Sequence, residues 1–136
     1  MISFSDATKI KDDGDFVREC IRSVVRGICY HEEELVRAHQ NLATAQSLVE
    51  RLGCSVDQQQ ALKIYEEDED NEPVGSADKL AQWLFGRAVW YVRHHEKKLS
   101  EEHALFGVVK TLIPRGSYDL SVDDIAAEVR RKYLEN

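Results

Sequence analysis

The chain has 136 residues, of which 43% are hydrophobic and 32% are charged. This composition is typical of a soluble globular domain and excludes an intrinsically disordered chain. The formal net charge is −7, but six of the 25 acidic residues fall within residues 66–72, so 18 basic residues face 19 acidic ones elsewhere. A nearly neutral body argues against a general affinity for nucleic acid or for an anionic membrane.

The cysteines and the hydrophobic runs indicate in which cellular compartment the protein resides. The chain has an odd number of cysteines, namely Cys20, Cys29 and Cys54, and no pair of them has the spacing of a zinc site. We therefore expect reduced thiols in or near the core. The first 13 residues contain no apolar core of the signal-peptide type. The longest apolar run, residues 88–92, is far too short to span a membrane. The sequence therefore predicts a cytoplasmic protein that does not bind membranes.

The first predicted element is a long helix over residues 15–52. Asp13 and Asp15 are candidates for its N-cap, and Gly53 is a natural stop at its C-terminal end. Apolar residues alternate at spacings of four and three, which is typical of a coiled-coil edge packed against another helix. This seam consists of Val17, Ile21, Val24, Ile28, His31, Leu35, Ala38, Leu42, Ala45, Val49 and Leu52. Its one strongly polar member is His31.

A shorter helix is predicted over residues 56–66, with Ser55 and Gln58 as a capping box. A dense run of acidic residues follows, and repulsion between like charges predicts a mobile connector over residues 66–75. We call these side chains the acidic patch; they are Glu66, Glu67, Asp68, Glu69, Asp70 and Glu72.

A second long helix is predicted over residues 77–113, because Pro114 and Gly116 then end it. Its own heptad line consists of Phe85, Val92, Leu99, Phe106 and Ile113. Since two such helices bury their seams best against each other, we expect them to pair.

The last predicted helix covers residues 122–134 and begins with a capping box of Ser121 and Asp124. No sustained alternation typical of strands is present. The predicted fold is all-α: a long antiparallel helical hairpin, braced by two or three short helices, in one bundle-like domain over residues 1–136.

Both seams become polar at the same level if the long helices are antiparallel, because His31 then faces the neighbourhood of His95 and Leu99. Three interpretations stay open: a hydrogen-bonded polar layer that fixes the register, a partly exposed seam that admits a partner, and a metal site. The metal ligands would be His31, Glu34, His95, Glu102 and His103. No histidine has a glutamate three residues before it, as the di-iron bundle motif requires, so a metal is not favoured.

The second long helix carries an aromatic face in addition to its heptad line. It consists of Leu80, Trp83, Leu84, Arg87, Trp90 and Tyr91. Residues 80–92 are apolar nearly all round, which implies burial on more than one side. The short helices can cover this face as core, or it can form an oligomer or partner interface, since Trp, Tyr and Arg are enriched at binding hot spots.

Arg18, Arg22 and Arg26 repeat every four residues and form an arginine stripe. Such a stripe is either a solvated face with ion pairs, to Glu19 or to acids elsewhere, or a surface that binds phosphates.

The chain contains no nucleophile elbow, phosphate-binding loop or H-E-x-x-H motif, which argues against an enzyme and against a cofactor.

The sequence therefore predicts a non-catalytic helical protein–protein interaction module that self-associates and acts as an adaptor or as a subunit of a larger complex. One alternative is a small acidic inhibitor or regulator, of the immunity type or a phage-encoded antagonist, whose acidic patch occupies a basic site on a target protein. Others are a metal-binding helical bundle and a nucleic-acid helper that uses the arginine stripe. No small-molecule substrate is implied.

Overall fold

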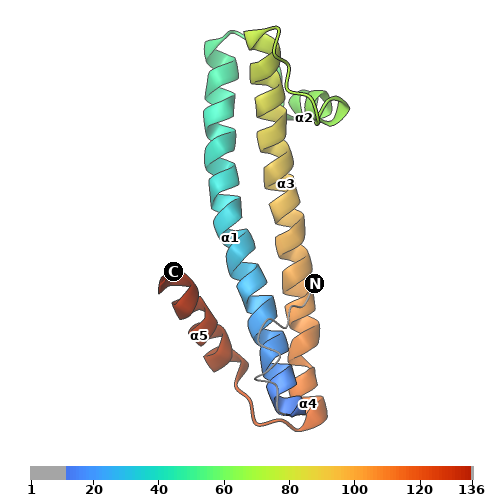
Figure 1. Ribbon diagram of the computed structural model, residues 1–136, viewed down its shortest axis with the longest axis vertical. Helices are drawn as coiled ribbons and strands as arrows, with labels where there is room; N and C mark the ends of the chain where they lie inside the picture. Colours follow the sequence, from blue (N-terminus) through green and yellow to red (C-terminus); the bar gives the residue numbers. More distant parts are fainter. Residues whose placement is uncertain (1–11, 136) are drawn as a thin grey trace. The chain divides into compact units, whose positions relative to one another are not determined.

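The structure is a computed structural model that describes residues 12–135. Its helices are α1 (Asp13–Arg51), α2 (Gln58–Glu67), α3 (Ala77–Lys110), α4 (Leu112–Gly116) and α5 (Val122–Glu135). This part of the chain is all-α without strands, and the long helices α1 and α3 pack together in opposite directions, as the two heptad lines predict (Figure 1). The first 13 residues, on which the prediction about a signal peptide depends, lie mostly outside the described residues.

None of the helices within residues 12–135 combines the length and the hydrophobicity that crossing a lipid bilayer requires.

The chain forms two compact units, and α1 and α3 contribute to both. Of the described residues, the first unit comprises 12–32 and 98–135, and it includes α4 and α5. The second unit is Glu33–Lys97 and includes α2. Each unit has a hydrophobic core of its own.

Both ends of α1 follow from local hydrogen bonds. The carboxylate of Asp12 accepts a bond from the backbone N–H of Asp15 at 2.8 Å, so Asp12 caps the helix, and the predicted candidates Asp13 and Asp15 lie in its first turn. At the other end Gly53 has φ +73°, and the N–H groups of residues 53 and 54 bond back to the carbonyls of residues 50 and 49. This is the Schellman arrangement, for which glycine is favoured because it lacks a Cβ. The predicted stop at Gly53 is confirmed.

The start of α2 differs from the prediction. Asp57, and not Ser55, is the N-cap: its carboxylate accepts a bond from the N–H of Gln60 at 2.8 Å, and the Gln60 side chain accepts one from the N–H of Asp57 at 3.0 Å. Both halves of a capping box are therefore present, two residues later than expected. The shift arises because three consecutive glutamines, residues 58–60, offer the same side chain at several registers.

The C-terminal end of α3 also differs. The helix ends at Lys110, and Pro114 lies inside the short helix α4 instead of following a helix that runs to residue 113. Proline is tolerated there because the first turn of a helix needs no internal N–H donor. Ser117, with φ +56°, ends α4. The start of α5 is as predicted in one half of its capping box, since Ser121 Oγ accepts a bond from the N–H of Asp124 at 3.3 Å.

The core of the first unit is built from branched aliphatic side chains of α1 together with residues of α3 and α5. Its buried members are Val17, Cys20, Ile21, Val24, Val25, Ile28, Cys29, Val109, Ile125 and Val129. Burial is the main reason that the pKa values of the Cys20 and Cys29 thiols are raised above their ordinary value. All three cysteines are free thiols, and Cys54 is half-buried in the second unit.

The core of the second unit depends on a close crossing of α2 over α3. It consists of Val49, Ala61, Leu62, Ala81, Phe85 and Val89. At the crossing a Cβ added to Gly86 would overlap the Ala61 carbonyl and lie 2.8 Å from the Cβ of Tyr65. Only glycine therefore lets the two helix backbones approach this closely.

We predict that Gly86→Ala lowers the free energy of unfolding by about 1 to 3 kcal/mol, because the added methyl group forces α2 away from α3. Gly107→Ala is the matched control on the same helix, since its Cβ would meet no atom within 4 Å. That change should stabilise the protein by about 0.5 to 1 kcal/mol. Urea unfolding followed by circular dichroism measures both, and equal stability of the two variants would contradict the close crossing.

Candidate functional site

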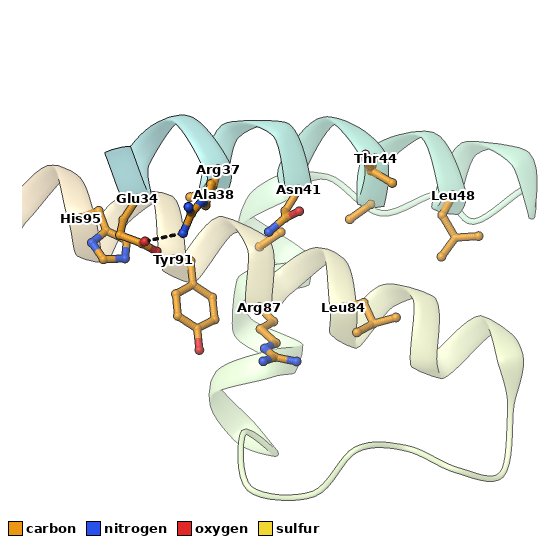
Figure 2. Close-up of a pocket in the computed structure, with 12 residues that line it drawn as sticks. Glu34, Arg37, Ala38, Asn41, Thr44, Leu48, Leu84, Arg87, Tyr91 and His95 are labelled. Carbon is orange, nitrogen blue, oxygen red and sulfur yellow. Dashed lines mark hydrogen bonds and ion pairs between the residues drawn. The ribbon is translucent and has the colours of Figure 1, made fainter. Parts of the chain in front are cut away.

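An open groove lies between α1 and α3 in the second unit (Figure 2). Its volume is about 480 Å³. We call it the α1–α3 groove; it is lined by Glu34, Arg37, Ala38, Asn41, Thr44, Ala45, Leu48, Leu84, Arg87, Ala88, Tyr91 and His95. All of these residues belong to the second unit.

The groove exists because the seam of α1 carries small residues at this level. Ala38 and Ala45 occupy seam positions, and Ala88 faces the same space from α3. Alanine side chains are too short to fill the space between two long helices. The two helices therefore pack together, but a groove stays open to solvent beside the alanines. Leu48 and Tyr91 are more than one-third exposed along its walls. The groove thus exposes apolar surface.

The two arginines of the groove differ in their partners. Arg37 donates to the carboxylates of Glu33 and Glu34, each at 2.9 Å, so its charge is balanced on its own helix. The guanidinium of Arg87 lies 5.8 Å from the Trp83 ring and 5.6 Å from the Tyr91 ring. These two rings form cation–π contacts with the guanidinium. No carboxylate of residues 12–135 lies within 4.0 Å of the Arg87 guanidinium. Arg87 is thus a half-buried cation without a counterion at this side of the groove.

The predicted aromatic face divides into two parts in the structure. Trp83 is only 3% exposed: its indole N–H donates to the Asp68 carbonyl at 2.9 Å, and its ring meets that of Tyr65 edge-on at 5.2 Å. Trp90 is half-buried, 6.3 Å from the Tyr65 ring and stacked on His94 at 4.7 Å. The tryptophan side of the face is therefore covered by α2 and the segment after it.

The other side of the aromatic face stays accessible. Leu84, Arg87 and Tyr91 line the α1–α3 groove, whereas Leu80 is half-buried outside its lining. Most of the contribution of α1 to this site, from Arg37 to Leu48, was missed from the sequence. The signal that could have found it is the appearance of alanine at two seam positions, Ala38 and Ala45, between larger aliphatic residues.

The candidate metal ligands do not form a cluster. Within the part of the chain that the structure describes, no group of three or more His, Cys, Asp or Glu side chains could hold a metal ion. Glu34 and His95 line the same groove, and His95 is buried. The Glu102 carboxylate lies beside Gly27 in the first unit, where His103 is exposed. His31 belongs to the first unit and His95 to the second, and their facing one another stays a prediction.

The acidic patch is exposed along its whole length. None of its six carboxylates forms an ion pair with a basic side chain of residues 12–135. The backbone of Asp68 is nevertheless anchored, because its carbonyl accepts the Trp83 indole bond and its N–H donates to Tyr65. The patch therefore starts from a fixed point beside the aromatic residues.

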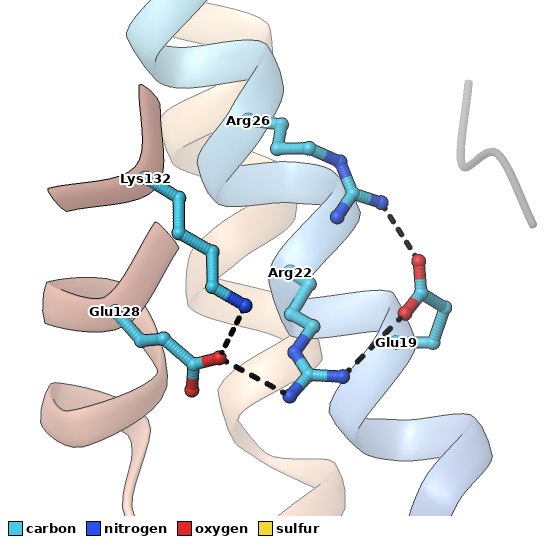
Figure 3. A network of polar contacts seen from close by, with 5 residues as sticks. All are labelled: Glu19, Arg22, Arg26, Glu128 and Lys132. Atoms are coloured by element: carbon cyan, nitrogen blue, oxygen red, sulfur yellow. Dashed lines mark hydrogen bonds and ion pairs between the residues drawn. The ribbon is translucent and has the colours of Figure 1, made fainter. Parts of the chain in front are cut away.

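Two residues of the arginine stripe, Arg22 and Arg26, form ion pairs (Figure 3). Glu19, which is buried, lies 2.7 Å from Arg26 and 4.0 Å from Arg22. Arg22 also lies 3.7 Å from Glu128 of α5, whose pKa is lowered mainly by a hydrogen bond from Lys132. The ion-pairing interpretation of this stripe is confirmed for two of its three arginines.

Comparisons of the chain with protein-family models, with curated proteins and with solved structures found no match.

We predict that Arg26→Ala lowers the free energy of unfolding by about 1 to 2 kcal/mol, because it removes the closest counterion of the buried Glu19 carboxylate. Arg18→Ala is the matched control, since Arg18 lies on the same stripe but forms no ion pair within the described residues. It should change stability by less than about 0.5 kcal/mol. Thermal and urea unfolding compare the two, and equal losses would mean that the pair with Glu19 contributes nothing.

Proposed function

We propose that this chain is a non-catalytic helical protein–protein interaction module that self-associates through the α1–α3 groove. The observation that carries the proposal is the open groove itself, where Leu84, Arg87 and Tyr91 of the predicted aromatic face meet the small side chains of α1. An exposed apolar groove between two helices is a common docking site for a further helix. As a self-associating unit, the chain would act as an adaptor or as a subunit of a larger complex.

The chemistry of the groove supports a protein partner. Tyrosine and arginine are enriched among the residues that contribute most to binding free energy, and Tyr91 and Arg87 lie side by side here. The short side chains of Ala38, Ala45 and Ala88 allow another helix to approach closely. Two hairpins that pair across this surface would form a four-helix arrangement, which is a common way to bury a second apolar stripe.

A second candidate function, a small acidic inhibitor, is supported by one observation: every carboxylate of the acidic patch is exposed and without an ion pair among residues 12–135. Such a patch would occupy a basic site on a target protein. Neutralising the patch would then abolish binding to that target, whereas changes in the apolar walls of the groove would leave the binding intact.

We predict a native mass of twice the chain mass of 15.6 kDa for the wild-type protein. The double variant Leu48→Ser, Tyr91→Ser should shift the equilibrium to the monomer by roughly tenfold or more, because it removes apolar contact surface from the groove walls. Native mass spectrometry and sedimentation velocity measure the distribution.

Val36→Ser is the control for this experiment, because Val36 is 58% exposed on α1 but does not line the groove. It should leave the dimer unchanged. A double variant that remains as dimeric as the control, with the helical content of the wild type, would show that the groove is not the contact surface.

A further inference from the structure

Two sets of charges in the second unit lack partners. The Arg87 guanidinium has aromatic neighbours but no carboxylate within 4.0 Å, and the acidic patch forms no ion pair, both within the described residues. A cation beside apolar surface loses its hydration when that surface is covered, so the covering molecule must supply an anion. The chain itself carries an excess of exposed anions.

These two sets of charges lie near each other. Arg87 follows Trp83 by one helical turn, and Trp83 is hydrogen-bonded to Asp68 at the start of the acidic patch. Burial is the main reason that the pKa of Tyr65 is raised; the charges of Glu69 and Asp70 raise it further, and that of Arg87 lowers it. Arg87 and the anchored backbone of Asp68 therefore both lie next to Trp83, whose ring also meets that of Tyr65.

A surface on which a cation and an anionic patch lie close together is self-complementary. In a two-fold symmetric contact, each copy offers its cation to the patch of the other, so the same pair forms twice. A second copy of this chain therefore satisfies the charge requirement of the groove without any other molecule.

We propose that the α1–α3 groove binds a second copy of this chain in a two-fold symmetric dimer, in which Arg87 of each copy pairs with Glu69 and Asp70 of the other. This inference rests on the proposed self-association and specifies its interface. The apolar walls of the groove supply contact area, and the two reciprocal ion pairs fix the orientation of the copies.

Reversing the charge on each side of the proposed ion pair tests this pairing. Arg87→Glu places like charges opposite each other at both contacts, and so does the double variant Glu69→Lys, Asp70→Lys. Each variant alone should dissociate the dimer, with affinity lowered roughly tenfold to a hundredfold. An equimolar mixture of the two variants should form a heterodimer, because each glutamate at position 87 then meets lysines and each remaining Arg87 meets the native acidic patch.

The measurement is native mass spectrometry of the full chain, in which the two variants differ in mass, with sedimentation velocity at low and high salt. The wild-type dimer should weaken as sodium chloride is added, because the ion pairs are screened. Arg93→Glu is the matched control, since Arg93 is exposed on α3, does not line the groove and forms no ion pair among residues 12–135. Circular dichroism checks that every variant keeps its helical content.

The possible failures are distinguishable. If the wild type is a dimer and both charge variants stay dimeric, the ion pairing is wrong and self-association stands. If each variant is monomeric but the mixture forms no heterodimer, the charges act within their own chain and the proposed interface is overturned. If the wild type is a monomer at all micromolar concentrations, self-association fails together with this inference.

Discussion

The structure depends on how the seam between α1 and α3 is filled. In the first unit, the seam residues of α1 are Val17, Ile21, Val24 and Ile28, whose branched side chains are all buried. In the second unit, Leu42 and Val49 still pack in the core, but Ala38 and Ala45 alternate with them and are too small to occupy the full width between two helices. The same pairing of long helices therefore encloses a core in both units and leaves an open groove beside the alanines of the second. Because helix pairing tolerates both fillings, the groove is accommodated without a change in the pairing of α1 and α3.

The second constraint is the crossing of α2 over α3 at Gly86. The missing side chain at this position lets Ala61 and Tyr65 reach the α3 backbone, which places α2 over Trp83. Because α2 covers the side of α3 that carries Gly86 and Trp83, that side is buried. Leu84 and Tyr91 lie on another side of α3 and line the groove. The position of α2 thus determines which part of the aromatic face is core and which part is accessible.

The sequence predicted the fold class because heptad spacing, glycine stops and capping residues are local signals. It placed the start of α2 two residues early because residues 58–60 are all glutamine and leave the register of the capping box ambiguous. It could identify the aromatic face but not divide it, since the division depends on the contact between Gly86 and Ala61, which are 25 positions apart in the chain. The ion pairs of the arginine stripe were predictable within α1, where Glu19 precedes Arg22 and Arg26 by helical spacings, but the additional pair with Glu128 depends on where α5 packs.

The charges of the second unit are a consequence of this same packing. The indole of Trp83 holds the backbone of Asp68 while the side chains of the acidic patch remain in water, where isolated carboxylates are stable. Arg87 is stabilised by the rings of Trp83 and Tyr91, and such an interaction suffices while one side of the guanidinium is still hydrated. Covering the groove removes that water and makes a carboxylate necessary. Under the proposed self-association, an interface that is only apolar would therefore be weak, and the acidic patch of the second copy would supply the negative charge.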